Sequence, residues 1–82
     1  MEIYYSHKAQ IDLENLPRDG QKRIAKKMRF YAYQKNPIKF AKRLTDYREG
    51  EFRFRIGDWR IFFDVKENRI FVLSIKHRSK AY

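Results

Sequence analysis

The dipeptide Gly57-Asp58 constrains this 82-residue chain most, because it stands between two segments in which apolar and polar residues alternate. Glycine at the first central position is what a two-residue type II′ turn requires, so the dipeptide predicts a β-hairpin. The turn also predicts the register, with Ile56 opposite Trp59 and Arg55 opposite Arg60. Opposed residues share a face of the sheet, as do alternate residues along one strand, so the two faces follow from the register.

One face of this predicted hairpin is apolar, and we expect it to pack against helices. Its residues are Phe52, Phe54, Ile56, Trp59, Ile61, Phe63 and Val65. The other face carries Arg53, Arg55 and Arg60. Any one of these arginines could be an ordinary solvated charge. A structural sheet would pair arginine with glutamate, however, and guanidinium groups match phosphate oxygens bidentately. Three arginines on one face therefore predict an anion-binding site.

A second hairpin is predicted with Glu67-Asn68 as its turn. Its register would place Val65 opposite Ile70, Phe62 opposite Leu73 and Arg60 opposite Ile75. By the same parity His77 would lie on the arginine face, with the tail to Tyr82 close enough to fold over it. A shift of one residue would reverse that placement. Four apolar residues share the arginine face in this register, and such a stripe is typical of a protein-binding surface: Phe62, Phe71, Leu73 and Ile75.

The rest of the chain completes one domain over residues 1–82. We expect a strand at about 1–6 and helices at about 7–16 and 21–34, separated by a breaker in which Asp19 can cap the second helix. Asn36-Pro37 ends that helix, and a connector at 37–50 leads to strands at about 51–56, 59–66 and 69–76. The order β-α-α-β-β-β predicts an α+β fold, with an N-terminal helical hairpin packed on an antiparallel sheet.

The charge balance indicates the class of partner. Twenty lysines and arginines against ten acidic residues give a net charge of +10. A domain this basic favours a polyanionic partner, nucleic acid first, with an anionic membrane or an acidic protein as the alternatives. The chain has no cysteine and two distant histidines, so we expect no metal and no cofactor. We see no leader and no apolar segment of membrane-spanning length, and we expect a soluble, cytoplasmic protein.

The C-terminal segment resembles the RelE/ParE toxin superfamily. The resemblance spans residues 50–82 and lies in the order and spacing of three groups of residues, whereas residues 1–49 agree only in element order. These groups are Gly50-Glu51-Phe52-Arg53-Phe54-Arg55-Ile56-Gly57-Asp58-Trp59-Arg60-Ile61-Phe62-Phe63, Val72-Leu73-Ser74-Ile75-Lys76-His77-Arg78, and Tyr82.

The resemblance implies a ribosome-dependent endoribonuclease that is silenced by a cognate antitoxin. RelE-like toxins cleave mRNA by attack of the 2′-hydroxyl on the adjacent phosphate, without a metal. Arg53 and Arg55 match basic positions that border the reacting hydroxyl and phosphate. Arg60 matches the residue that neutralises the phosphate, Arg78 the residue proposed to assist the leaving oxygen, and Tyr82 the tyrosine that stacks on a base.

Some residues depart from the family pattern. Arg53 and Arg55 stand where the best-known member has lysines, and arginine stays protonated, so neither can act as a base. We assign the general base or acid to His77, with a structural role as the alternative. Three lysines on the second helix are either a solvated face or contacts to ribosomal RNA: Lys22, Lys26 and Lys27. We expect the antitoxin to cover the apolar stripe.

Two other functions compete with the ribonuclease. A ParE-like toxin poisons DNA gyrase and lacks the ribonuclease residues, and the His77-Arg78 and Tyr82 ending favours the RelE side. A non-catalytic RNA-binding or degenerate toxin domain is the third possibility, because no lysine base is present.

Overall fold

The computed structural model describes residues 1–46 and 48–81. Its elements confirm the predicted order β-α-α-β-β-β and add a two-residue strand and two short 3-10 helices in the segments expected to be irregular. Their bounds are β1 (Glu2–Tyr5), α1 (His7–Glu14), α2 (Arg18–Tyr33), η1 (Pro37–Phe40), β2 (Lys42–Arg43), β3 (Phe52–Ile56), β4 (Trp59–Lys66), β5 (Arg69–His77) and η2 (Arg78–Lys80).

The start of α2 corrects one local expectation. Asp19 lies in the first turn of the helix, and Pro17 takes the capping position without a side-chain hydrogen bond. The carboxylate of Asp19 is therefore placed to interact with the positive end of the helix dipole instead of capping a backbone N–H.

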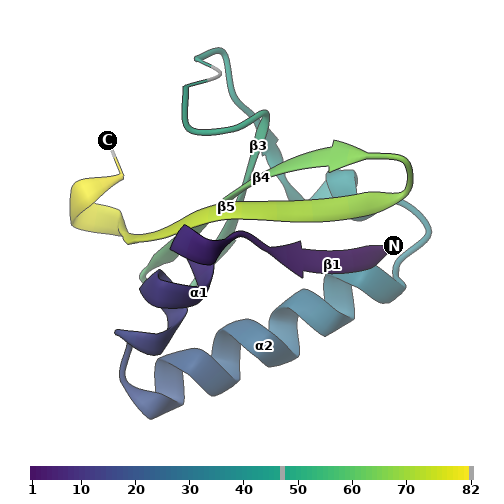
Figure 1. Cartoon of the computed structure of the whole chain (residues 1–82). Coiled ribbons are helices and arrows are strands. Elements are labelled where there is room, and N and C mark those ends of the chain that lie inside the picture. The colour runs from purple at the N-terminus through teal and green to yellow at the C-terminus, as the bar shows by residue number, and fades with distance from the viewer. Residues whose placement is uncertain (47, 82) are drawn as a thin grey trace.

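The five strands form one sheet in the order β1-β5-β4-β3-β2. Both helices lie on one side of it, as Figure 1 shows, and this confirms the α+β fold. The sheet is mixed rather than wholly antiparallel, because β1 pairs with β5 in parallel. The two helices between β1 and the hairpins return the chain so that β1 and β5 run in the same direction. We call the sheet face away from the helices the outer face.

The core is an aromatic layer between α2 and the sheet. Phe54 is fully buried and stacks on Phe63 with ring centroids 4.3 Å apart, and Tyr31 of α2 stacks on Phe54 at 4.2 Å. Met28 and Ile24, one and two turns before Tyr31 in α2, are also fully buried. Each such side chain contributes about 1.5–3 kcal/mol by leaving water. The layer holds β3 and β4 rigid beneath the outer face.

The first hairpin is as the sequence predicts. The four cross-strand pairs that the turn predicts for β3 and β4 are present, from Arg53 opposite Phe62 to Ile56 opposite Trp59, and Phe52 opposite Phe63 continues the same register. Gly57 has φ +57°, as the first central residue of a type II′ turn requires. A Cβ atom at Gly57 would lie 2.8 Å from Nη1 of Arg23. The guanidinium of this α2 residue therefore lies against the turn.

The second hairpin has the predicted turn, but a β-bulge changes its register. Val65 lies opposite Ile70, and both turn residues have positive φ, as in a type I′ turn. Between Phe62 and Phe63 the register shifts by one, so that Phe62 lies opposite Ser74 and Leu73 is the extra residue. The predicted pairing of Phe62 with Leu73 is therefore wrong.

The same shift continues to the end of β5. Lys76, and not Ile75, lies opposite Arg60, and His77 lies opposite Trp59. Ile75 and His77 consequently belong to the face that packs against the helices, and Lys76 belongs to the outer face.

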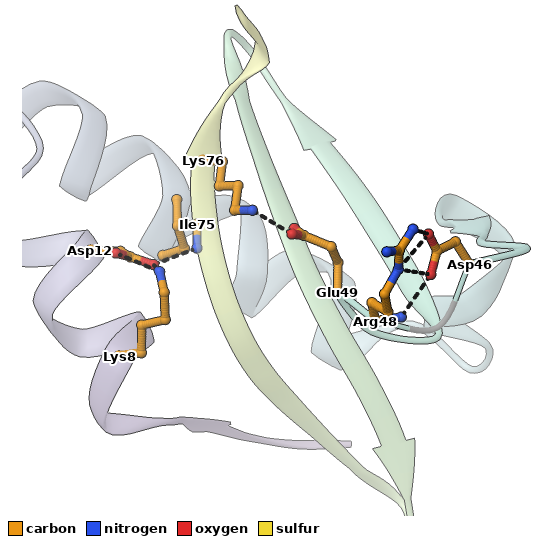
Figure 2. Close-up of polar contacts among 7 residues, drawn as sticks. All are labelled: Lys8, Asp12, Asp46, Arg48, Glu49, Ile75 and Lys76. Carbon is orange, nitrogen blue, oxygen red and sulfur yellow. Dashed lines mark hydrogen bonds and ion pairs between the residues drawn. The ribbon is translucent and has the colours of Figure 1, made fainter. Parts of the chain in front are cut away.

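The bulge falls where β5 changes its neighbour. β1 pairs with β5 as far as Val72, and beyond that point α1 lies along the strand. Ser6 Oγ donates a hydrogen bond to the carbonyl oxygen of Leu73 at 3.0 Å. Oδ2 of Asp12 accepts one from the backbone N–H of Ile75, also at 3.0 Å, as Figure 2 shows. The side chains of Ser6, which caps α1, and of Asp12 within α1 thus satisfy polar groups that a neighbouring strand would otherwise pair.

Candidate anion-binding site on the outer face

A hollow of about 410 Å³ opens on the outer face, and we call it the outer hollow. Arg53 of β3 and the aromatic ring of Phe62, which is only 2% exposed, belong to its wall. The connector and the tail supply the remainder, so residues far apart in sequence meet here. The lining residues are Lys42, Arg43, Leu44, Thr45, Asp46, Glu49, Arg53, Phe62 and Ala81.

The three arginines of the first hairpin occupy different environments. Arg53 is half-buried and lines the outer hollow, and Arg55 is exposed. Arg60, opposite Arg55, is only 2% exposed. Its Nη1 donates hydrogen bonds to the carbonyl oxygens of Gly57 at 2.9 Å and Trp59 at 3.0 Å.

The expectation of three solvent-facing guanidinium groups is therefore wrong for Arg60. Strand parity predicts the face from which a side chain leaves the backbone. It does not predict where a long side chain ends, and Arg60 turns back to bind the turn that precedes it. A direct contact between Arg60 and a phosphate is not available in this conformation.

His77 lies away from the arginines, and its predicted place on their face is wrong. Its ring meets Trp59 edge-on, with centroids 5.2 Å apart, and lines a second hollow of about 650 Å³ between α1 and β5. Nδ1 accepts a hydrogen bond from the backbone N–H of Ser79 at 3.2 Å. In this arrangement the neutral ring carries its proton on Nε2. The bulge at Leu73 is the cause of the misplacement.

The tail returns to the arginine face, as the sequence predicts. The backbone N–H of Arg78 donates to the carbonyl oxygen of Asp58 at 2.7 Å, and its Nε lies 3.7 Å from Oδ1 of the same residue. The 3-10 turn that follows brings Ala81 to the wall of the outer hollow. The role predicted for Arg78 stays a prediction. Tyr82 lies outside the described residues, so its role also stays a prediction.

The apolar stripe predicted to bind an antitoxin is smaller than expected. Ile75 is 5% exposed and belongs to the core beneath the sheet, and Phe62 is buried in the outer face. Only Phe71 and Leu73 remain half-buried on the outer face. Phe71 stacks on Tyr4 of β1 with centroids 5.5 Å apart. Phe62 keeps its predicted place on the outer face but is buried there, whereas the predicted place of Ile75 is wrong because of the bulge.

Two carboxylates of the connector line the outer hollow, and the sequence reasoning missed both. Asp46 accepts hydrogen bonds from Arg48, 3.0 Å from Nε and 2.6 Å from Nη2. These bonds lower the pKa of Asp46 from 3.8 to about 2. Oε1 of Glu49 pairs with Nζ of Lys76 from β5, and Figure 2 shows this contact between connector and strand. The sequence did offer one signal for Glu49, because a glycine directly after it can mark a close approach of the backbone to another element.

Gly50 is what brings the connector onto the sheet. It has φ +143°, and a Cβ atom there would lie 3.2 Å from both N and O of Phe63. The connector backbone therefore packs directly against β4, which only glycine permits. Glu49, one residue earlier, is thereby held beside the outer face.

The helix lysines predicted to contact RNA are exposed on α2: Lys22, Lys26 and Lys27. Nζ of Lys27 lies 5.2 Å from the ring centroid of Phe30, which is itself 48% exposed. Among the described residues, no group of three or more histidine, aspartate or glutamate side chains could hold a metal ion. No helix within residues 1–46 and 48–81 is long and apolar enough to cross a membrane.

Solved structures share this fold. The archaeal RelE–RelB complex of Pyrococcus horikoshii aligns with a TM-score of 0.76 and 23% identity over 98% of this chain and 97% of that chain. The toxin–antitoxin complex RelBE2 of Mycobacterium tuberculosis aligns with a TM-score of 0.69 and 23% identity over 94% and 96%. The RelB–RelE complex of Methanococcus jannaschii aligns with a TM-score of 0.69 and 23% identity over 95% and 93%.

The sequence itself identifies the family. No curated protein matches the chain significantly. The model of the ParE toxin of type II toxin–antitoxin systems, by contrast, matches residues 3–82, almost the whole chain. This confirms the resemblance to the RelE/ParE superfamily and extends it over the N-terminal half. The chain therefore belongs to the ParE toxin family of type II toxin–antitoxin systems.

Proposed function

We propose that this toxin is a ribosome-dependent endoribonuclease that cleaves mRNA in the cytoplasm by metal-free attack of a 2′-hydroxyl on the adjacent phosphate. The observation that carries the proposal is the outer hollow of about 410 Å³, which is lined by Lys42 and Arg53, two cross-strand neighbours on the outer face. A concave basic surface concentrates field lines and attracts a phosphate backbone. The net charge of +10 acts in the same direction.

The two accessible arginines of β3 would bind the reacting phosphate. Arg53 lines the hollow, and Arg55 follows on the same face of the strand. Their guanidinium groups can hold phosphate oxygens through paired N–H···O bonds and stabilise the charge of the transition state. Arg60 would act indirectly, because its guanidinium holds the turn that follows Arg55.

The exposed lysines of α2 would contact ribosomal RNA. Lys22, Lys26 and Lys27 lie on the helix side of the sheet, away from the outer face. Messenger RNA in the outer hollow would leave these lysines available to a second stretch of phosphate backbone. Each such contact makes binding more dependent on salt.

A cognate antitoxin would silence the toxin by covering the outer face. The three similar structures are complexes of RelE or RelBE toxins with their antitoxins. We propose that the antitoxin of this toxin packs apolar side chains on Phe71 and Leu73 and places acidic side chains in the outer hollow. Such a segment complements both the apolar and the basic parts of the surface.

The decisive experiment is translation in a purified system with one defined mRNA. We expect wild-type toxin to cut the mRNA at codon-defined positions, and only when ribosomes are present. Arg53→Ala and Arg55→Ala should each slow cleavage by about 10²–10³, the usual effect of removing one preorganised donor. Lys66→Ala, an exposed change at the far end of β4, is the matched control and should cleave at the wild-type rate. Intact mRNA with active ribosomes and wild-type toxin would contradict the proposal.

A gyrase poison is the second candidate, and the match to a ParE model is the observation that favours it. A supercoiling assay with purified DNA gyrase distinguishes the two, because a ribonuclease should leave the assay unaffected. A chain that binds RNA but neither cleaves it nor inhibits gyrase would be a catalytically weak homologue.

A further inference from the structure

The proposed cleavage requires a group that accepts the proton of the 2′-hydroxyl. Arginine cannot do this, because its guanidinium stays protonated. His77 lies on the helix face, opposite Trp59, and does not reach the arginines. Among the described residues that line the outer hollow, the carboxylates are those of Asp46 and Glu49.

We infer, on the basis of the proposed ribonuclease function, that Glu49 is the general base of this toxin. Its carboxylate lines the same hollow as Arg53, so a phosphate held by that arginine would place the neighbouring ribose next to it. The backbone contact of Gly50 with Phe63 fixes the position of the connector on the sheet. Glu49 therefore has a defined place relative to β3 and β4.

One of the two carboxylate oxygens of Glu49 has no hydrogen-bond donor. Oε1 pairs with Nζ of Lys76, whereas Oε2 is enclosed and accepts no hydrogen bond from any described residue. An enclosed acceptor without a donor costs about 1–3 kcal/mol, and retention of such a cost indicates a chemical role. Because Oε2 is out of contact with solvent, a ribose hydroxyl can reach it only after the carboxylate rotates. Rotation about the Cγ–Cδ bond exchanges the two oxygens, so either can face the hollow.

Asp46 is less suited to the same task. Both of its oxygens accept hydrogen bonds from Arg48. Because these bonds hold the pKa of Asp46 at about 2, its carboxylate is a weak base. Figure 2 shows Asp46 bound to Arg48 while Glu49 faces β5.

The proposed step is balanced in atoms and charge. Glu49 takes the proton of the 2′-hydroxyl as the bond between the 2′-oxygen and phosphorus forms. The bond from phosphorus to the 5′-oxygen breaks, and that oxygen takes a proton from water. The products are a 2′,3′-cyclic phosphate and a free 5′-hydroxyl, and Glu49 returns its proton to solvent.

Charged groups from several elements surround Glu49. They are Lys42 of β2, Arg53 of β3, Asp46 and Arg48 of the connector and Lys76 of β5. The cations among them offset the negative charge of the carboxylate.

Single-turnover cleavage on programmed ribosomes, measured as a function of pH, tests the inference. Glu49→Gln keeps the shape of the side chain and can still accept a hydrogen bond from Lys76, but cannot accept the proton. It should slow the cleavage step by about 10²–10⁴, remove the acidic limb of the pH profile and leave ribosome affinity unchanged. Glu14→Gln, an exposed change on α1, is the matched control.

Chemical rescue separates a base from a residue that only orders the connector. Added formate should restore part of the activity of Glu49→Ala if the missing function is proton transfer, and should do nothing for Arg53→Ala. A Glu49→Gln toxin that cleaves at the wild-type rate with the wild-type pH profile overturns the inference and leaves the ribonuclease proposal intact. Wild-type toxin that fails to cleave overturns both.

Discussion

Asp12 of α1 accepts a hydrogen bond through Oδ2 from the backbone N–H of Ile75, 3.0 Å away, at the part of β5 that β1 does not reach. The same oxygen lies 2.9 Å from Nζ of Lys8. The carboxylate is 19% exposed, whereas the lysine is 63% exposed. A helix side chain thus accepts the backbone hydrogen bond that a neighbouring strand would accept. The bond to Ile75 and the ion pair with Lys8 should differ in how much they stabilise the fold.

Asp12→Ala should lower the free energy of unfolding by about 1–3 kcal/mol, because it leaves the backbone N–H of Ile75 without an acceptor. Lys8→Ala should cost no more than about 0.5 kcal/mol, since it removes only an exposed i,i+4 ion pair. Urea denaturation of the two variants measures the difference. Equal small losses would show that the bond to Ile75 contributes little.

Arg60→Ala should destabilise the protein as well as affect its activity. The guanidinium is buried, and its removal leaves the carbonyl oxygens of Gly57 and Trp59 without their donor, at a cost of about 1–3 kcal/mol. Arg55→Ala, at the exposed position opposite, should leave the unfolding midpoint almost unchanged. Thermal unfolding of the pair measures this. A fully stable Arg60→Ala variant would contradict the buried role.

Two glycines should respond in opposite directions to alanine. Gly57→Ala should destabilise by about 1–2 kcal/mol, because φ is +57° at that position. Gly20→Ala, inside α2, should be neutral or stabilise by up to about 1 kcal/mol, since its Cβ would meet Trp59 at 3.4 Å, an ordinary contact. The added methyl group of Gly57→Ala would also approach the Arg23 guanidinium, but that flexible side chain can move away.

Gly57→Ala should therefore lower the free energy of unfolding by the same amount in wild type and in an Arg23→Ala background. A large difference between the two backgrounds would show that the Arg23 contact, and not the positive φ, causes the loss.

The carboxyl of Asp46 should titrate at about pH 2, and Arg48→Ala should return its pKa toward the ordinary 3.8. Because the pKa of Asp46 is depressed, its hydrogen-bonded pair with Arg48 contributes fully above about pH 4. It is lost as the pH falls through about 2. Carbon-13 NMR of the side-chain carboxyl measures both midpoints. An unshifted wild-type midpoint would show that the pair does not persist in solution.

His77→Gln should keep most of the proposed cleavage activity and its dependence on pH. The ring lies on the helix face, edge-on to Trp59, and its Nδ1 bonds to Ser79 of its own tail. Single-turnover cleavage beside Glu49→Gln makes the comparison direct. A loss of an order of magnitude or more, with a flattened pH profile, would return the proton-transfer role to His77.

Local sequence signals predicted most of the fold. Gly57-Asp58 and Glu67-Asn68 define both turns, and the alternation around the first turn predicts the register between β3 and β4. Strand periodicity is local, so it can be read without knowing what packs against the strand. The α+β layers followed from element order. The parallel pairing of β1 with β5 was not predicted, because a parallel neighbour leaves no local signal.

What only the tertiary structure decided is which side chains share the outer face near the end of β5, and where their ends lie. The extra residue at Leu73 falls where β1 stops and α1 begins, and it moves His77 and Ile75 to the helix face while bringing Lys76 to the outer face. The arrangement depends on Ser6 and Asp12, more than sixty residues earlier in the chain. Glu49 reaches the outer hollow because Gly50 lets the connector backbone touch β4. A sequence pattern records the preference of each residue for its neighbours along the chain, whereas these contacts depend on packing between distant segments.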